Sequence, residues 1–235
     1  MKFRNYVLPI IAVLFSLSSV NAQTVDEIID KYIEAIGGKE KLSQVKSLTL
    51  ENSMEVMGNQ APVTEYLLDG KGYKSISEFN GMKIINCYND KAGWSVNPMA
   101  GGSDAQAMPD GMYNAGKDQI YVGGALLDYA AKGYKVELIG KEGDGYKIKV
   151  SNGSNESFYF IDATTYYINK SIVKSEMMGQ PVDVTTTFSD YKKTDFGIVL
   201  AYTKNTDLGM FQLASKTTKV EANKEIDPKI FEIPK

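Results

Sequence analysis

Few side chains in this sequence have the type and spacing that catalysis needs, and most of them are carboxylates. Asp104 and Asp110 lie in a Gly- and Met-rich stretch, where two carboxylates could serve as the acid and base of a glycoside hydrolase. Asp144 lies in the Glu142–Gly145 turn but lacks the series of further oxygen ligands of a calcium loop. Because acidic residues in such loops are usually solvated, we predict no catalytic residue and no metal site.

The single cysteine, Cys87, lies within an apolar, strand-like run from Lys83 to Tyr88. A reactive thiol needs cations near a helix start to stabilise its thiolate, and no such arrangement is visible around Cys87. We therefore expect a small, buried side chain at this position. One cysteine also cannot form a disulfide within the chain.

The absence of histidine and the near absence of arginine exclude many function classes. The sequence has no His, and Arg4, its one arginine, lies in the N-terminal leader. Without an imidazole there is no Ser-His-Asp catalysis, and typical catalytic zinc sites lose their usual ligands. Without an arginine fork, bidentate binding of phosphate or carboxylate is excluded. We therefore predict a protein that is not an enzyme and that has no cofactor.

The first 22 residues have the pattern of a secretory signal peptide. A basic start at Met1–Asn5 precedes a mostly apolar run, and small residues stand at Val20 and Ala22. We expect cleavage after Ala22 and export to the periplasm; an uncleaved anchor helix is the alternative. Residues 23–235 then form a single domain. A net charge of −3, with dispersed lysines, gives no reason to expect a nucleic-acid partner.

One helix and a long series of strands make up the rest of the predicted fold. Thr24 and Glu27 form a capping box, and apolar residues follow at helical spacing until Gly37 and Gly38 end the helix. From Val45 onward the apolar residues alternate instead, as in antiparallel strands with one wet face. The expected strands are 45–56, 63–68, 73–79, 82–88, 94–96, 134–139, 146–150, 157–161, 167–177, 182–191, 198–205 and 210–220.

Residues 97–118 interrupt the strand pattern with a segment rich in Gly, small residues and Met. A loop of this length inside a compact domain is usually functional or disordered, and Met suits adaptable apolar surfaces. The segment is therefore either a mobile lid over an apolar cavity or a poorly ordered crossover. A second helix is predicted for Asp118–Ala131, although Gly123 and Gly124 weaken it.

The order of these elements resembles a known family of exported proteins. The first helix ends in Ala35–Leu42, the strands begin at Val45–Leu48, and the chain closes with Pro228–Pro234. With the central loop and helix, this order is similar to the outer-membrane lipoprotein-sorting proteins of Bacteroidota type, in the superfamily of the lipoprotein carriers LolA and LolB. The resemblance implies an α+β fold, a strongly curved antiparallel half-barrel sheet of about 11 strands, with the N-terminal and central helices on its concave side.

The same resemblance implies a periplasmic, non-catalytic carrier that acts in outer-membrane lipoprotein sorting. Its concave face would hold a lipoprotein acyl chain or another lipid-like ligand, and its partners would include an envelope or outer-membrane protein and the membrane surface. The family's carrier depends on an Arg near the cavity mouth, and residues 23–235 contain none. The alternative is an envelope protein–protein interaction module without a bound lipid.

Strand alternation and the central loop supply the candidate ligand-binding residues. We expect the cavity lining to comprise Leu48, Leu50, Met54, Tyr66, Leu68, Ile76, Ile84 and Trp94, and the lid to comprise Met99, Met108 and Met112. All of these side chains would also suit an ordinary core. The choice depends on strand register, because a slip of one residue turns every side chain to the other face of the sheet.

Overall fold

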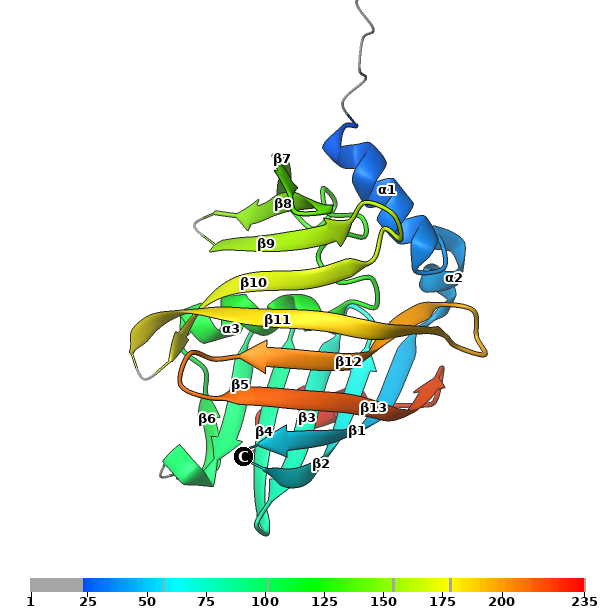
Figure 1. Cartoon of the computed structure of the whole chain (residues 1–235). Coiled ribbons are helices and arrows are strands. Elements are labelled where there is room, and N and C mark those ends of the chain that lie inside the picture. The colour runs from blue at the N-terminus through cyan, green and yellow to red at the C-terminus, as the bar shows by residue number, and fades with distance from the viewer. Residues whose placement is uncertain (1–22, 57, 101, 154, 178, 235) are drawn as a thin grey trace, which may run out of the picture.

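One antiparallel sheet of 13 strands dominates the computed structural model (Figure 1). The structure describes residues 23–56, 58–100, 102–153, 155–177 and 179–234, so the predicted signal peptide lies outside the described residues. The strands are β1 (Ser47–Val56), β2 (Asn59–Leu68), β3 (Gly72–Phe79), β4 (Met82–Asn89), β5 (Gly93–Asn97), β6 (Gly102–Ala107), β7 (Lys135–Glu142), β8 (Gly145–Asn152), β9 (Asn155–Asp162), β10 (Ile168–Met177), β11 (Gln180–Lys193), β12 (Val199–Asp207) and β13 (Gln212–Ala222).

The sheet consists of two meanders that are joined where the first and last strands pair. Its strand order is β6-β5-β4-β3-β2-β1-β13-β12-β11-β10-β9-β8-β7, so β6 and β7 are the two edges. β1 lies antiparallel to β13 with Leu48 opposite Ala222, and the pairing is irregular between Glu51 and Asn52. Figure 1 shows β11–β13 running across the direction of β3–β5, so the strand direction changes strongly through the sheet.

The predicted N-terminal helix is confirmed as α1 (Val25–Ala35). The Thr24 side chain accepts the Glu27 backbone N–H, and the Glu27 side chain accepts the Thr24 N–H, which completes the capping box. Ile28, Ile29 and Ile33 are buried in the core. The turn to α2 (Lys39–Gln44) needs Gly37, because its φ is 127° and a Cβ there would lie 3.0 Å from the Gly197 carbonyl oxygen.

The expected strands are present, and the structure adds one that the sequence analysis missed. β6 lies within residues 97–118, the segment that was expected to be a loop, so that expectation is wrong, and the expected count of about 11 becomes 13. Its residues Gly102–Ala107 carry almost no apolar signal, and only Ala105 approaches a hydrophobic cluster. Pairing with β5, rather than side-chain pattern, makes this segment a strand.

The central helix lies earlier in the chain than predicted. α3 (Asp110–Gly116) and the 3₁₀ turn η2 (Lys117–Ile120) are helical, whereas residues 121–133 form a series of turns. Gly124 and Asp128 have positive φ, which interrupts a helix, and the Asp69 carboxylate accepts the Val122 N–H. The prediction of a helix over Asp118–Ala131 is therefore wrong, although Leu126 within it is buried as expected of its apolar residues.

The helices and the 108–134 segment pack against one face of the sheet. A single apolar cluster contains residues of α1, α2 and η2 together with residues of β1–β4 and β8–β10. α3 contacts β10, while η2 contacts β2, β3 and β4, which lie on the other side of β1 in the strand order. Among the described residues, no helix has both the length and the apolar character needed to cross a membrane.

Candidate functional site

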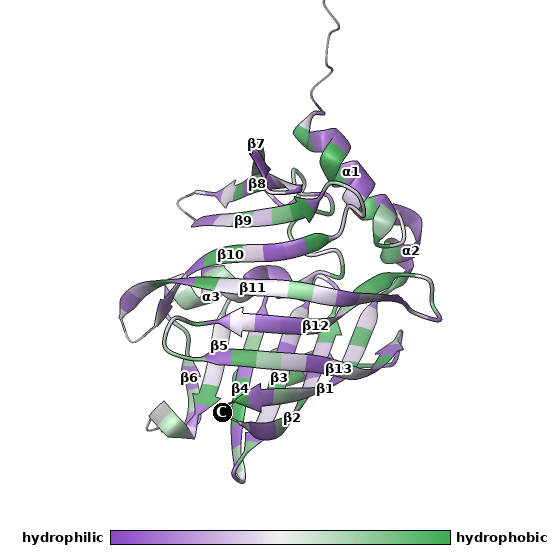
Figure 2. Ribbon diagram, in the orientation of Figure 1, coloured by the Kyte–Doolittle hydropathy of each residue, from purple (hydrophilic) through white to green (hydrophobic). Residues whose placement is uncertain are grey.

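The cross-strand register defines two faces of the sheet. Leu48 lies opposite Leu67, Leu67 opposite Tyr73, and Tyr73 opposite Tyr88. Residues directly opposite each other on neighbouring antiparallel strands project to the same side. All four are buried in the cluster that the helices complete, so we call their side the inner face and the other side the outer face. Figure 2 shows the alternating hydrophobic and hydrophilic colours along the strands that this arrangement produces.

The eight predicted cavity residues do not share one face. Register places Leu48, Leu50, Met54 and Ile84 on the inner face. It places Tyr66, Leu68, Ile76 and Trp94 on the outer face. The expectation of one common lining is therefore wrong, because both faces of β2–β5 carry apolar residues and alternation alone does not distinguish them.

Three of the four outer-face residues, Tyr66, Leu68 and Trp94, are covered by the C-terminal end of the chain. The 3₁₀ turn η3 (Pro228–Phe231) brings the Phe231 ring over Gly72, where a Cβ would lie 2.3 Å from the ring. The Phe231 carbonyl accepts hydrogen bonds from Trp94 Nε1 at 3.0 Å and from Asn89 Nδ2 at 3.2 Å. Tyr66, Leu68 and Trp94 belong to this cluster, so their apolar surface packs against the chain itself.

Two of the three predicted lid methionines join the core. Met108 is 8% exposed, and its sulfur lies where a Cβ on Gly93 would be 2.7 Å away. Met112, in α3, packs against the inner cluster, whereas Met99, in the 3₁₀ turn η1 (Pro98–Ala100), is 62% exposed. Met108 and Met112 thus lie over the inner face, as expected of lid residues. The mobility of this lid remains a prediction.

The cover of the inner face is the segment from Met108 to Tyr134. Gly116 lies directly against the Tyr88 ring, since a Cβ at this position would be 2.2 Å from it. Ile120 and Leu126 are almost completely buried, and the Gly70 N–H donates to the Ile120 carbonyl at 2.8 Å. This backbone bond, and the bond from the Val122 N–H to the Asp69 carboxylate, anchor the segment to the β2–β3 turn. It contributes no strand to the inner part of the sheet, so its removal would uncover apolar surface.

A small polar pocket of about 200 Å³ is lined mainly by residues of this cover, together with Asp90 and Asn152. The Tyr134 hydroxyl donates to Asp118, and Lys132 Nζ donates to the carbonyls of Gly124 and Leu127. Burial raises the pKa of Asp118 and lowers the pKa of Lys132. Burial, with the Asp118 carboxylate, also raises the pKa of Tyr134. These groups bond to one another and to the backbone of the cover itself, so they stabilise the cover's own conformation.

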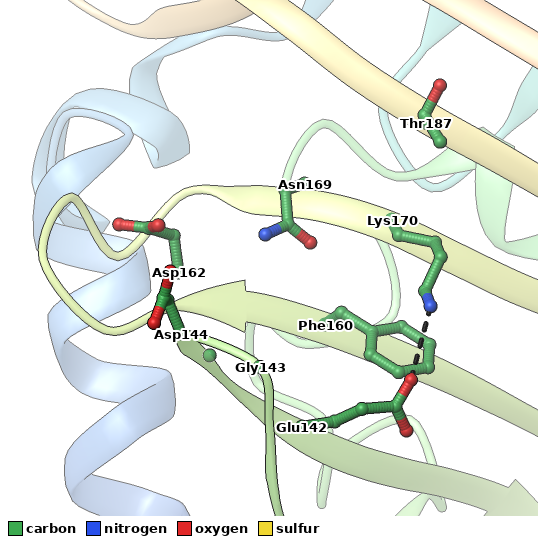
Figure 3. Close-up of a pocket in the computed structure, with 9 residues that line it drawn as sticks. Glu142, Gly143, Asp144, Phe160, Asp162, Asn169, Lys170 and Thr187 are labelled. Atoms are coloured by element: carbon green, nitrogen blue, oxygen red, sulfur yellow. Dashed lines mark hydrogen bonds and ion pairs between the residues drawn. The ribbon is translucent and has the colours of Figure 1, made fainter.

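A larger pocket of about 430 Å³ opens on the outer face of β8–β10 (Figure 3). Lys170 Nζ lies 3.7 Å from the centre of the Phe160 ring and 3.3 Å from a Glu142 carboxylate oxygen. Lys147 lowers the pKa of Glu142 through a hydrogen bond, and Lys170 adds to this effect. Figure 3 shows Asp144 and Asp162 near each other at one end of this pocket. Its charges are paired with each other or solvated, an arrangement suited to a surface and not to an acyl chain.

The inner face also carries a set of polar side chains next to its apolar part. The sequence analysis did not single them out as a group. Asn52 is 5% exposed, and its Oδ1 accepts the Thr217 hydroxyl at 2.7 Å, but its Nδ2 has no acceptor among the described residues. Glu65, on the same face, forms an ion pair with Lys204 at 3.8 Å. The alternation that begins at Leu48 includes Asn52, but only the pairing of β1, β2, β12 and β13 brings the four residues together.

The buried Asn52–Thr217 pair gives a first testable prediction. Thr217→Val should lower the free energy of unfolding by about 1–3 kcal/mol, because it leaves the whole Asn52 amide unpaired in the interior. Asn52→Leu combined with Thr217→Val should recover most of this loss, since replacing both partners removes the unpaired groups. Urea unfolding followed by circular dichroism measures both values. A double variant that is less stable than Thr217→Val would show that the unpaired Asn52 amide is not the cause of the loss.

Comparison with known proteins adds structural relatives. No protein-family model matches the chain, and no curated protein sequence matches it. A LolA superfamily protein from Nitrosomonas europaea superposes with a TM-score of 0.58 at 10% identity, covering 90% of this chain and 98% of that one. The chain has a LolA-like fold.

Two further structures share this fold. A putative outer membrane lipoprotein-sorting protein domain from Vibrio parahaemolyticus gives a TM-score of 0.54 at 14% identity, covering 86% of this chain and 95% of that one. A DUF1329 family protein from Desulfovibrio piger gives 0.58 at 14% identity, with 90% and 98% covered. At these identities the likeness shows the fold alone, so the Bacteroidota-type subdivision stays a prediction.

The LolA-like fold does not bring the candidate catalytic carboxylates into a site. Asp104 lies in β6 and Asp110 begins α3, and both side chains are exposed. Within the part of the chain that the structure describes, no three His, Cys, Asp or Glu side chains are grouped to hold a metal. Cys87 is fully buried, and burial raises the pKa of its thiol to about 12, which keeps it protonated and unreactive.

Proposed function

We propose that this protein is a periplasmic, non-catalytic carrier that binds a lipoprotein acyl chain or a related lipid on the inner face of its sheet. The observation that carries the proposal is the covered inner face, in which an apolar, LolA-like sheet is closed by a segment that adds no strand to it. A protein of similar fold is described as a putative outer membrane lipoprotein-sorting protein domain. The predicted signal peptide adds support for export to the periplasm.

The contacts of the cover support the proposed half-barrel. α3 touches β10 while η2, directly after it in the chain, touches β2–β4. A flat sheet would separate β4 from β10 by six intervening neighbours in the strand order, each about 4.8 Å apart. A sheet that curves strongly around the cover brings both within reach of one short segment. The cover then occupies the place where an acyl chain would lie.

Physical chemistry supports an exchange between cover and ligand. Displacing residues 108–134 would expose Leu67, Tyr73 and Tyr88 to water, which is unfavourable. An acyl chain gains about 0.8 kcal/mol for each methylene that it buries, so it can replace the contacts that the cover makes. Binding and release then need only a change of conformation. Neither histidine nor arginine is required for this cycle.

The test is whether the protein binds acyl chains. Native mass spectrometry of protein purified from its host should show a species heavier by an acyl-bearing molecule, and a fluorescent fatty-acid probe should bind and be displaced by palmitoyl compounds. A ligand-free mass together with no probe binding would refute the carrier proposal. Heat-unfolded protein serves as the control for non-specific uptake of the probe.

A second candidate is an envelope protein–protein interaction module that binds no lipid. The filled inner face favours it, because the described core leaves the acyl-chain site occupied by the chain's own residues. The free edges β6 and β7 offer unpaired backbone groups to a partner strand. Capture of a specific envelope protein by a chain that binds no acyl probe would support this candidate over the carrier.

A further inference from the structure

A row of polar side chains crosses the inner face of the first meander. In register, Glu65 lies opposite Ser75, Ser75 opposite Asn86, Asn86 opposite Ser95, and Ser95 opposite Gln106. All five therefore project to the inner side of β2–β6, and we call them the polar row. Each is partly or fully exposed, in contrast to buried Tyr73 and Tyr88 further along β3 and β4.

The polar row adjoins the covered apolar surface. Ser75 is the next inner-face residue after Tyr73, about 7 Å further along β3, because side chains on one face repeat every second residue. Tyr73 and Tyr88 belong to the apolar cluster on which the cover packs. A ligand chain lying in place of the cover would thus end beside the row. The inner face has an apolar part and a polar part in direct succession.

The charges around the row balance. Glu65 is the acidic member, and Lys204 reaches it from β12 at 3.8 Å, with the Glu65 side chain 13% exposed. Burial, followed by the nearby Glu65 carboxylate, raises the pKa of Tyr73, so its hydroxyl stays neutral. Ser75, Asn86, Ser95 and Gln106 are uncharged and offer both donors and acceptors. This combination suits a neutral group that both donates and accepts hydrogen bonds.

A buried amide group points independently to a polar ligand. Asn52 lies on the inner face, diagonal to Glu65 across the β1–β2 pair. Its Nδ2 is buried and has no acceptor in the described structure, although buried donors are nearly always paired. A polar atom brought in by a ligand would provide the missing acceptor. The polar row and this donor lie on the same side of neighbouring strands.

We infer that the polar row binds the neutral, hydroxyl- or amide-bearing head group of the ligand whose acyl chain replaces the cover. This assignment rests on the proposed carrier function and narrows its ligand class. A glycerol or peptide-amide head group offers hydroxyls or N–H and C=O groups that match the row. A fatty-acid carboxylate has no N–H or O–H to donate to the row, and it would add a net negative charge beside Glu65, whose own charge Lys204 already offsets.

The inference is tested by competition binding on the full chain. Three competitors are compared for their ability to displace a fluorescent fatty-acid probe: palmitoylglycerol, N-palmitoylglycinamide and palmitic acid. Each is tested on the wild type and on a triple variant that carries Ser75→Ala, Asn86→Leu and Ser95→Ala. The wild type should prefer the two neutral compounds over palmitic acid by roughly five- to tenfold, since each net hydrogen bond contributes about a factor of five. The variant should lose this preference and keep its affinity for palmitic acid. The two neutral probes distinguish a glycerol from an amide head group.

A matched control and two contrary outcomes complete the test. Thr64→Val changes one hydroxyl on the outer face of β2, next to Glu65, and should leave every affinity unchanged. Equal wild-type affinity for all three compounds would overturn the head-group assignment while leaving the carrier proposal intact. If none of the compounds displaces the probe or binds the wild type, both proposals fail together. Circular dichroism spectra and unfolding midpoints confirm that each variant is folded.

Discussion

A disulfide between positions 111 and 176 is expected to weaken acyl-chain binding by more than about tenfold until it is reduced. A Cβ built on Gly111 of α3 lies 3.2 Å from the Cβ of Glu176 in β10. Disulfides join Cβ atoms that are about 3.5–4.5 Å apart, so Gly111→Cys with Glu176→Cys needs only a small adjustment. The bond would fix α3 to β10 and hold the cover on the inner face.

The expected effect is large because the 108–134 cover lies on the inner face, where the acyl chain is proposed to bind, and must leave it before the chain can enter. An oxidised cover keeps Tyr88 and the neighbouring apolar surface closed, and a ligand cannot bind a state that is no longer populated. The fluorescent probe should therefore bind more than about tenfold more weakly to the oxidised protein. Reduction should restore the wild-type affinity. Cys87 does not compete, because it is fully buried and its thiol has a pKa of about 12.

The disulfide variant contains its own control. The oxidised and reduced forms share one sequence, so a difference between them reports the constraint alone, and each single cysteine variant shows whether the substitutions matter. Mass spectrometry after thiol labelling measures how much of the protein is cross-linked. Unchanged affinity in the fully oxidised protein would mean that α3 does not gate the ligand site, and it would require a different entry for the acyl chain.

Local sequence signals were sufficient for the elements whose pattern depends only on neighbouring residues. The Thr24–Glu27 capping box and the apolar spacing that follows it predicted α1, because both are contained within one short stretch of chain. Alternation found the strands for the same reason. β6 escaped because its strand state comes from pairing with β5 and not from its own side chains.

The faces of the sheet could not be predicted, because they depend on pairing between distant segments. Leu48 and Trp94 both looked like lining residues, yet register turns the first inward and the second towards Phe231. Apolar residues on both sides of β2–β5 serve two different covers, the 108–134 segment and the C-terminal tail. A one-sided sheet would have shown a single clean alternation.

The polar part of the inner face was missed for a related reason. Asn52 and Glu65 stand at positions whose neighbours in the alternation are apolar, so each looks like an isolated polar interruption of its own strand. Only the register of β1 with β2 and β13, and of β13 with β12, shows that they lie together with Lys204 on the inner face, where Lys204 pairs with Glu65. Phe231, in the closing Pro228–Pro234 segment, was likewise not among the expected core residues, although it is one of the most buried side chains.

Phe231→Ala is expected to lower the free energy of unfolding by about 3–5 kcal/mol, the usual loss for removing a buried aromatic side chain. Phe231 is 2% exposed and its ring fills the space above Gly72, so the variant leaves a cavity on the outer face. The tail is also held by the bond from Trp94 Nε1 to the Phe231 carbonyl. Urea unfolding followed by circular dichroism measures the loss.

Trp94 reports the same change independently, because it is the only tryptophan in the chain and is 2% exposed. Loosening of the tail in Phe231→Ala should shift its fluorescence emission to longer wavelength as water reaches the indole. Ile233→Ala, in the same tail but 49% exposed, is the matched control and should change stability by less than about 0.5 kcal/mol. Equal losses for the two variants would contradict a specific anchor at Phe231. Affinity for the acyl probe should stay unchanged in both, because the tail covers the outer face whereas the proposed ligand site lies on the inner one.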